Sequence, residues 1–567
     1  MEAQTKNCQN CKKDFVIESE DFNYYEKIKV PAPTWCPKCR MERRLSFINT
    51  WSIYWRNCDK CGEKSMSMYT PDQDVMVYCP TCWWSDDWDG TEYAMDYDPK
   101  VPFLEQVKEL SKKTPYTALD TLYKSLKNSN YSNGMSWCKN CYMVFWADYC
   151  EEVYYSSLLN NLKYSSDCIR GVDSELCYES SGFYKCYQTF FSEMCRNSVD
   201  VWFSRNCYSC TNCIGCVNLR GASYQIFNIK YTKEEYQEKI KELKLDSWAG
   251  IQELKKKAYA FWRTKPMREY DGNSLNVNST GEYIYECRNS KEIYIGEELE
   301  NCKWCQFITV PTTKDCLDYS GWGDNASLIY EATMAGLNAS LVKFSHQCLS
   351  DVFNIEYSIW CISGKNNFGC VNLKRKSFCI LNKEYSKEEF EKLKDQIIED
   401  MKKNPYIDKL GRKFFYGEFF PLEIGKFPYN KSNAMKFLPK TKEEAVAEGY
   451  SWVETEENIY KITKSAELLS DKITETEENI LDEVVGCASC GRGYKIVRGE
   501  LDLLRKMNLP LPHECPKCRE SKRFARMTKP SMYNRTCQKC NKAIYTPYAP
   551  GRPEIVYCVQ CYQQEFI

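Results

Sequence analysis

Cysteine thiols are the groups in this sequence whose type and spacing could carry chemistry. The chain of 567 residues contains 35 cysteines but only two histidines, His346 and His513, so thiolate would have to supply most ligands of any metal. Sixteen of the cysteines form C-x-x-C pairs near the two ends, and the second set repeats the first at a constant offset of 479 residues. They are Cys8, Cys11, Cys36, Cys39, Cys58, Cys61, Cys79, Cys82, Cys487, Cys490, Cys515, Cys518, Cys537, Cys540, Cys558 and Cys561.

This spacing predicts structural zinc. A C-x-x-C turn presents two thiolates to one ion, and two such turns complete the tetrahedral shell of a zinc site. We therefore expect two zinc ions at each end of the chain and four in total. Sequential pairing of the turns is favoured, and interleaved pairing of the RING type stays as the alternative. Four-thiolate sites are closed, so we expect them to stabilise the fold and not to catalyse.

The sequences around these cysteines resemble known zinc domains. CQNCKKDF followed by YYEKIKVPAPTWCPKCRMERR, and CASCGRGY followed by LLRKMNLPLPHECPKCRESKRF, resemble the "probable zinc-ribbon" treble-clef family. The next segments, CDKCGEKSMSMYTPDQDVMVYCPTC and CQKCNKAIYTPYAPGRPEIVYCVQC, are similar to small bacterial C-x-x-C zinc-binding domains. The resemblance implies structural zinc and no reaction. The whole chain resembles uncharacterised bacterial zinc-ribbon proteins.

Charge is concentrated at the C-terminal end. The chain has a formal charge of -1, but residues 487–567 contain 15 Lys and Arg against 6 Asp and Glu. Two four-thiolate zinc sites reduce this surplus from +9 to about +5. An anionic partner is expected, with RNA favoured over DNA. The candidate contacts are Arg519, Lys522, Arg523, Arg526, Tyr533 and Arg535.

Protein binding is the closest alternative function. The N-terminal cysteine set lies in an acidic segment yet keeps the same spacing, so basic residues near thiolates can simply neutralise them. A scaffold with protein partners would need no basic surface.

The middle of the chain must position these ends, and it follows a nine-residue pattern. In rows from Cys141 it reads CYMVFWADY, CEEVYYSSL, LNNLKYSSD, CIRGVDSEL, CYESSGFYK, CYQTFFSEM, CRNSVDVWF. The first column holds only Cys and Leu, so it is predicted to point inward. Short β-compatible segments at a fixed period favour a parallel β-solenoid, with two rows making an eighteen-residue coil.

The solenoid pattern occurs twice. GCVNLRGASYQIFNIKYTKEEYQEKI from Gly215 returns as GCVNLKRKSFCILNKEYSKEEFEKL from Gly369, and each copy ends in a capping-box helix, at Thr232–Glu235 and Ser386–Glu389. The predicted fold is mainly β: a duplicated parallel β-solenoid with capping helices, flanked by duplicated double zinc-ribbon or treble-clef modules. The predicted units are a zinc module (1–95), a helical linker (96–136), a first solenoid repeat (137–250), a linker (251–282), a second repeat (283–402), a linker with helices (403–486) and a second zinc module (487–567).

Other cysteines leave alternatives open. Cys207, Cys210, Cys213 and Cys216 have a spacing near that of iron–sulfur ligands, but Gly364 and Asn367 replace the middle two in the second copy, which favours buried ladder cysteines. The lone pairs Cys138/Cys141 and Cys302/Cys305 could share a fifth zinc.

An enzyme acting on carbohydrate is a further alternative, because parallel β-helices often carry carboxylate sites; the candidates are Asp167, Asp173, Glu175, Asp315 and Asp318. The chain has no phosphate loop, nucleophile elbow or HExxH motif, so a non-enzymatic protein is favoured.

No apolar stretch is long enough to span a bilayer, and no membrane contact is expected. We predict a soluble cytoplasmic protein, with helices at 102–111 and 441–449 and a solvated helix at 461–485.

Overall fold

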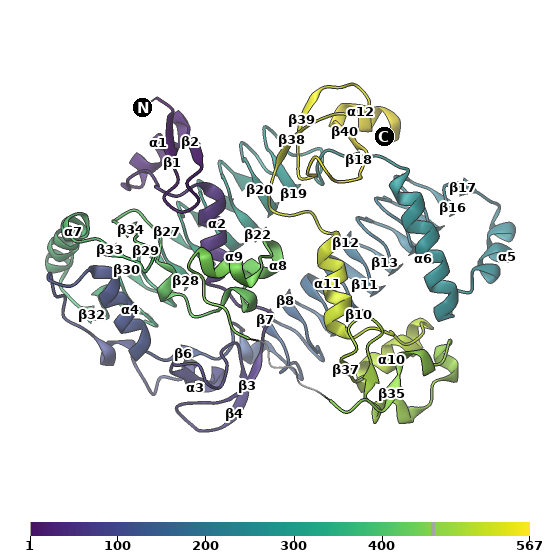
Figure 1. Cartoon of the computed structure of the whole chain (residues 1–567), viewed down its shortest axis with the longest axis horizontal. Helices are drawn as coiled ribbons and strands as arrows, with labels where there is room; N and C mark the ends of the chain where they lie inside the picture. Colours follow the sequence, from purple (N-terminus) through teal and green to yellow (C-terminus); the bar gives the residue numbers. More distant parts are fainter. Residues whose placement is uncertain (1, 455–459, 567) are drawn as a thin grey trace.

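The computed structural model describes residues 2–454 and 460–566, and two stacks of parallel strands dominate it (Figure 1). The first stack begins with β7 (Asn133–Ser136) and ends with β16 (Ser223–Ile226). The second begins with β19 (Gly281–Tyr285) and ends with β31 (Ser377–Ile380). The molecule is therefore mainly β, as predicted.

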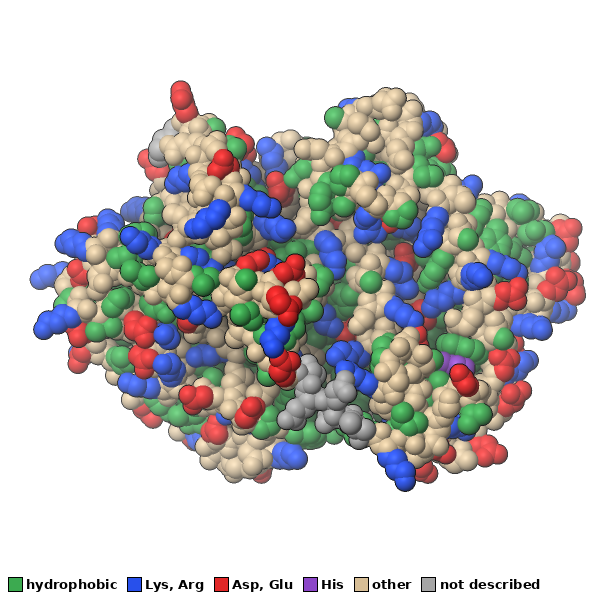
Figure 2. Space-filling view, viewed as in Figure 1, with side chains coloured by type: hydrophobic (Ala, Val, Ile, Leu, Met, Phe, Trp, Pro, Cys, Tyr) green, Lys and Arg blue, Asp and Glu red, His purple; other side chains and the backbone are tan. Residues whose placement is uncertain are grey.

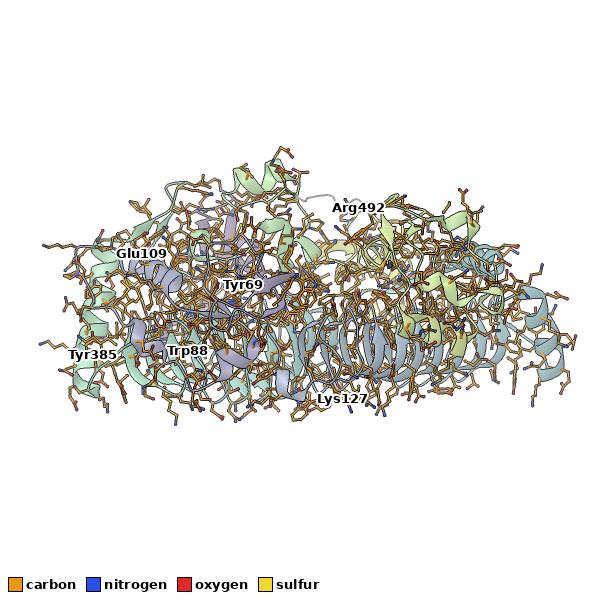
Figure 3. The ribbon with its side chains drawn as sticks, turned by 90° about the horizontal axis from the view of Figure 1, so that it is seen from below. Tyr69, Trp88, Glu109, Lys127, Tyr385 and Arg492 are labelled. Carbon is orange, nitrogen blue, oxygen red and sulfur yellow. The ribbon has the colours of Figure 1, made fainter. Side chains whose placement is uncertain are left out.

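Each strand pairs in parallel with a strand that lies close to it in the sequence, and the strands of the second stack alternate between two sheets up to β28. The other strands of the first stack are β8 (Phe145–Asp148), β9 (Glu151–Tyr154), β10 (Ser157–Ser166), β11 (Ile169–Tyr178), β12 (Ser181–Tyr184), β13 (Tyr187–Phe190), β14 (Val199–Trp202) and β15 (Thr211–Ile214). Those of the second are β20 (Ile293–Glu297), β21 (Leu299–Glu300), β22 (Gln306–Val310), β23 (Thr313–Lys314), β24 (Ser320–Gly323), β25 (Ala326–Ser327), β26 (Thr333–Gly336), β27 (Ser340–Lys343), β28 (His346–Leu349), β29 (Phe353–Glu356) and β30 (Lys365–Phe368). In Figure 3 the strands above Lys127 form an evenly spaced row.

The register between neighbouring strands is 12 residues in the first stack. Tyr187 pairs with Val199, which pairs with Thr211. The second stack also contains a longer step, since Gln306 pairs with Ser320. The expected eighteen-residue coil is therefore wrong.

A backbone repeat of three residues explains this register. Every third residue of the first stack has a positive φ, for example Asn197, Asp200, Phe203 and Asn206. Each such residue turns the chain, so four triplets make one 12-residue step. The nine-residue pattern spans three triplets. Two cysteines nine residues apart both point into the interior of the stack, but from different sides of it. For example, the Sγ of Cys186 lies 3.4 Å from the carbonyl oxygen of Cys195.

The inward column itself is buried as predicted. Its members in the first stack are Cys141, Cys150, Leu159, Cys168, Cys177, Cys186 and Cys195, and all are at most 5% exposed. Cysteine thus fills the narrow interior as a small apolar side chain.

A helix follows the last parallel strand of each stack, after a short antiparallel strand (β17, Ile229–Lys230; β32, Lys383–Glu384). Helix α5 (Lys233–Leu243) begins at Thr232, and α7 (Lys387–Lys403) begins at Ser386; both have the predicted capping box. They lie at the two outer ends of the molecule (Figure 1). No helix in the described ranges is both long and apolar enough to cross a membrane.

The connecting segments differ in part from expectation. Helices α4 (Phe103–Lys113) and α9 (Lys442–Ala447) form where they were predicted, and α6 (Trp248–Arg263) lies in a segment expected to be a linker. The solvated helix expected at 461–485 is wrong: this segment contains only short 3-10 turns and β strands. Ala466, Leu469, Ile473 and Ile480 are buried beside α10 (Arg498–Met507), and this packing overrides the helical charge pattern.

Each terminal cysteine module lies beside the stack that is farther from it along the sequence (Figure 1). The N-terminal cysteine module (residues 1–95) contains β1 (Gln4–Asn7), β2 (Asp14–Ile17), α1 (Ser19–Lys27), α2 (Pro37–Ser46), β3 (Tyr54–Asn57), β4 (Lys64–Ser67), β5 (Val77–Tyr78) and α3 (Pro80–Trp84). The C-terminal cysteine module (487–567) contains β37 (Gly493–Tyr494), α10, α11 (Pro516–Arg526), β38 (Tyr533–Thr536), β39 (Ala543–Thr546), β40 (Val556–Tyr557) and α12 (Val559–Phe566). Figure 1 shows α2 beside the second stack and α11 beside the first.

Each module is also joined to a linker by a short parallel strand pair. Strand β5 pairs with β6 (Tyr116–Thr117), and β40 pairs with β18 (Met267–Arg268). The smaller elements are β33 (Tyr406–Ile407), β34 (Lys413–Phe414), α8 (Asn433–Phe437), β35 (Lys464–Ser465) and β36 (Val485–Gly486).

Candidate metal centres

The structure gathers the terminal cysteines into four groups. Within each group the four sulfur atoms all lie within 4.8 Å of one another. The groups are Cys8, Cys11, Cys36, Cys39; Cys58, Cys61, Cys79, Cys82; Cys487, Cys490, Cys515, Cys518; and Cys537, Cys540, Cys558, Cys561. This is the sequential pairing of the C-x-x-C turns, and the interleaved alternative does not occur.

Each group is built from a tight turn and the first turn of a helix. Cys8 and Cys11 lie in the turn between β1 and β2, whereas Cys36 immediately precedes α2, whose first residue is Pro37. Proline suits this position because it needs no N–H donor there. The amide of Cys36 donates to the Sγ of Cys8 at 3.2 Å. The corresponding amide-to-sulfur bonds are Cys79 to Cys58, Cys515 to Cys487 and Cys558 to Cys537.

The spacing of the sulfur atoms suits a tetrahedral metal ion. The Sγ atoms of Cys11 and Cys36 are 3.8 Å apart, as are those of Cys490 and Cys515. A tetrahedron with a zinc–sulfur distance of about 2.3 Å has sulfur atoms about 3.8 Å apart, whereas a disulfide would require about 2.05 Å. The donor set therefore fits zinc.

Backbone amides favour the thiolate form of the first cysteine. Burial raises the pKa of Cys487, but the amides of Cys515, Cys490 and Ser489 outweigh burial and hold the pKa at about 7. Cys487 thus offers a thiolate close to neutral pH. An ion held by all four cysteines of a group would have no open position for a substrate.

The helix that begins within each CPKCR motif inserts arginines into a stack. In α2, Arg40, Arg43 and Arg44 are fully buried. The Nη2 of Arg40 lies 2.7 Å from the Oδ2 of Asp318, and the Nη2 of Arg43 lies 2.7 Å from the Oε1 of Glu331. Both carboxylates are buried in the second stack.

Helix α11 makes the same kind of contact with the first stack. Arg519 and Arg523 each approach one carboxylate oxygen of Asp167 at 2.7 Å. Arg519 also lies 3.0 Å from Glu500 of α10, and all four side chains are buried. Because Arg40 and Arg519 are the final residues of the two CPKCR motifs, the motif joins a metal ligand to a buried ion pair.

The residues expected to bind nucleic acid are partly buried in these contacts. Arg519 and Arg523 are 6% and 2% exposed, so they cannot contact RNA in this structure. Arg526 pairs with Glu193 at 2.8 Å, and Lys522 pairs with Glu514. Arg535 donates to two carbonyl groups, and Tyr533 lines a cavity of about 270 Å³ beside the start of α2. The six predicted residues therefore do not form one exposed basic patch.

The candidate catalytic carboxylates are also engaged elsewhere. Asp167 and Asp318 hold the arginines of α11 and α2. Asp315 pairs with Lys27 at 3.0 Å, Asp173 accepts a hydrogen bond from Asn161, and Glu175 is half-buried. Two of the five candidates are therefore occupied by buried ion pairs with arginine.

The internal cysteines do not form further centres in the described chain. Cys207, Cys210, Cys213 and Cys216 are buried, but they are not among the groups whose ligand atoms converge. The pairs Cys138/Cys141 and Cys302/Cys305 are likewise outside those groups, so the structure offers no support for a fifth zinc.

A buried histidine, His346, packs against Phe47 at the end of α2. We expect it to make the stability of the fold depend on pH. His346 of β28 is 7% exposed, stacks edge-on against Phe47 and hydrogen-bonds through Nδ1 with Thr333. Burial lowers the pKa of His346 to about 3. In the unfolded chain this pKa is about 6.5, so the unfolded state binds one more proton as the pH falls from 6.5 towards 3.

We expect His346→Gln to reduce the loss of stability on acidification over this pH window. The difference in unfolding free energy between wild type and variant should change by about 1.4 kcal/mol per pH unit between pH 6 and pH 4. Denaturant melts at several pH values measure it, and the comparison cancels acid release of zinc. Parallel pH profiles for the two proteins would contradict a neutral buried imidazole.

Comparisons with known proteins name no family for this chain. No family model and no curated protein matches it. Among solved structures it is similar to a "putative acetyltransferase" from Desulfovibrio desulfuricans G20, with 10% identity over 53% of this chain and 75% of that chain. The TM-score of 0.11 is too low to carry an argument.

Proposed function

We propose that this chain is a non-enzymatic, zinc-dependent binding scaffold. In this proposal its two stacks are duplicated β-solenoid units, and each terminal zinc module clamps the stack that is farther away along the sequence. The observation that carries the proposal is the docking of both CPKCR helices, in which Arg40 meets Asp318 and Arg519 meets Asp167.

Buried ion pairs suit a clamp. Such pairs add little net stability, because desolvation offsets their attraction, but removing one partner leaves an uncompensated buried charge. They therefore favour one docked arrangement over others. Zinc at the start of α2 and α11 would fix where each helix begins, and hence which carboxylate its arginines reach.

Amide hydrogen exchange on the full chain tests the clamp. In Arg519→Gln/Arg523→Gln we expect exchange to become about tenfold faster or more in the strands around Asp167. In Arg40→Gln/Arg44→Gln the increase should appear around Asp318. Arg375→Gln, which removes a largely exposed pair with Asp86, is the matched control. If exchange rose only within the substituted helices, the clamp would be ruled out.

Nucleic-acid binding is the second candidate for what the scaffold binds. Figure 2 supports it with Lys and Arg side chains along the hollow between the two halves of the molecule, below the C-terminal module. Since two of the arginines first expected to bind are buried, the site must lie elsewhere.

A further inference from the structure

Arginine and tyrosine alternate along one edge of the first stack. Tyr184, Arg196, Tyr208 and Arg220 follow at intervals of 12 residues, and each forms a parallel bridge with the next. All four side chains are half-buried. Neighbouring strands lie about 4.8 Å apart, so the two arginines recur at about twice that distance along the stack.

Tyrosines from both stacks support the guanidinium groups of this edge. The Cζ of Arg220 lies 3.9 Å from the ring centre of Tyr208. The Cζ of Arg196 lies 4.2 Å from the ring centre of Tyr285, which belongs to the second stack. A guanidinium that rests on a ring keeps its N–H groups directed sideways in one plane. The arginines are therefore held in a fixed orientation.

Positive charge exceeds negative charge at this place. Arg170 and Arg268 extend the cluster, and Asp271 lies among them, 3.6 Å from the Nη2 of Arg170. Within the described ranges no carboxylate pairs with Arg196, Arg220 or Arg268 at 4.0 Å or less. Of these four guanidinium groups, Arg170 alone has an ion-pair partner among the described residues, Asp271. Burial raises the pKa of the adjacent Glu282 to about 8, so it adds little negative charge at pH 7.

Some donors of the cluster have no partner. The Nε atoms of Arg220 and Arg268 are buried without a hydrogen bond. The Nη1 of Arg268 donates to the carbonyl of Gly272 at 2.6 Å, which fixes the side chain but does not neutralise it. These two Nε–H groups therefore make no hydrogen bond within the described chain.

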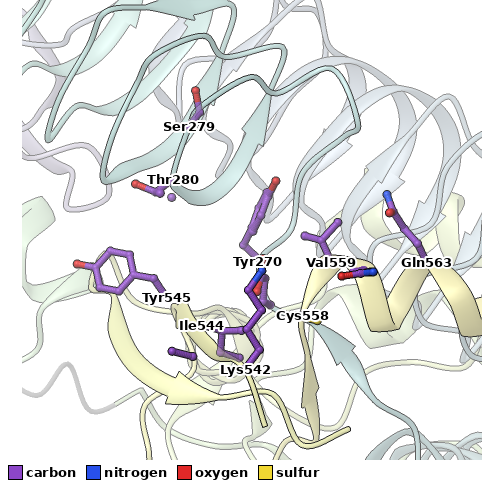
Figure 4. Close-up of a pocket in the computed structure, with 13 residues that line it drawn as sticks. Tyr270, Ser279, Thr280, Lys542, Ile544, Tyr545, Cys558, Val559 and Gln563 are labelled. Carbon is purple, nitrogen blue, oxygen red and sulfur yellow. The ribbon is translucent and has the colours of Figure 1, made fainter. Parts of the chain in front are cut away.

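A pocket lies beside the cluster. The pocket has a volume of about 370 Å³ and lies between the start of the second stack and the C-terminal module (Figure 4). Tyr270 lines it, and the Cζ of Arg268 lies 4.7 Å from the ring centre of Tyr270. Lys542 and Tyr545 line the opposite wall. The pocket and the cluster thus share the Tyr270 side chain.

We propose that this arginine–tyrosine seam, defined by Arg170, Arg196, Tyr208, Arg220, Arg268 and Tyr285, binds the phosphate groups of single-stranded RNA. Planar guanidinium groups match phosphate oxygens in pairs, and their regular spacing suits a ligand with regularly repeated charges. The tyrosine and lysine of the pocket wall provide a place for a base to stack and a further phosphate contact. The proposal specifies the second candidate function and does not depend on the clamp.

Fluorescence anisotropy with a labelled twelve-nucleotide oligo(U) RNA tests the seam on the full, zinc-loaded chain. We expect Arg196→Gln/Arg220→Gln to weaken binding at least tenfold. Loss of two phosphate contacts should also make the salt dependence shallower, with the slope of log K against log salt changing by about 1.4. Arg288→Gln/Arg375→Gln removes two exposed arginines elsewhere and should bind as wild type does.

Several results would overturn the proposal. They are unchanged affinity of the seam variant, an equal loss in the control pair, or binding of heparin without binding of RNA. Should the double variant fold poorly, ultraviolet crosslinking of the wild type to RNA containing 4-thiouridine decides. Adducts are expected on peptides with Tyr208, Tyr270 or Tyr285, and adducts only elsewhere would refute the seam. The exchange test of the clamp is separate, so either proposal can fail alone.

Discussion

Replacement of Asp318 by Asn is expected to lower the free energy of unfolding by about 3–5 kcal/mol, the usual effect of breaking a buried ion pair. Asp318 is fully buried and lies 2.7 Å from Arg40 and 3.5 Å from Arg44. The amide cannot neutralise these guanidinium groups, which would stay buried with too little negative charge around them. Urea-induced unfolding of the zinc-loaded protein measures the effect.

Asp315→Asn is the matched control for this change. Asp315 lies three residues earlier on the same stack, but its ion pair with Lys27 is exposed to solvent. Exposed pairs contribute about 0–1 kcal/mol, so this variant should unfold almost as wild type does. Equal losses for the two variants would show that burial of the α2 arginines does not govern stability here.

Loss of one zinc ligand should have a still larger local effect. In Cys36→Ser the first group keeps three thiolates, and zinc binding of about 10–16 kcal/mol per structural site is weakened or lost. Helix α2 would then lose the fixed start from which Arg40 reaches Asp318. We expect trypsin to cleave within residues 37–46 of the variant long before it cleaves this segment of the wild type.

Cys302→Ala separates metal binding from the mere loss of a buried thiol. Cys302 is buried inside the second stack and belongs to none of the convergent groups of the described chain. This variant should keep its zinc and resist cleavage at α2. Rapid cleavage of α2 in both variants would mean that the first group does not control the helix.

The metal centres could be predicted because their signal is local. A C-x-x-C turn fixes two thiolates within a few residues, and the repeated separations indicated which turns belong together. The capping boxes at Thr232 and Ser386 were readable for the same reason, since each is a contact between residues three apart.

The 12-residue register between neighbouring strands could not be read from the cysteine spacing. Nine residues separate inward cysteines because three triplets pass between them, but the chain needs a fourth triplet to return to the same side. The register becomes apparent only from the positive φ angle at every third residue. Such positions are filled by Asn and Asp but also by Trp and Phe, so the pattern of residue types conceals it.

The burial of the arginines was also hidden from sequence. Arg519 and Arg523 have the same charge pattern whether they face water or a buried aspartate, and their partner Asp167 is more than 350 residues away. One signal could have helped. Asp167 and Glu179 are 12 residues apart, and Asp318 and Glu331 are 13 apart. These separations equal the local register between paired strands, so two acids of each stack lie side by side.

Elemental analysis of the purified full chain tests the central claim most directly. The account predicts four zinc ions per chain, falling to three in Cys36→Ser and in Cys515→Ser and to two in the double variant. Fewer than two zinc ions in the wild type, or the same zinc content in all three variants, would contradict it.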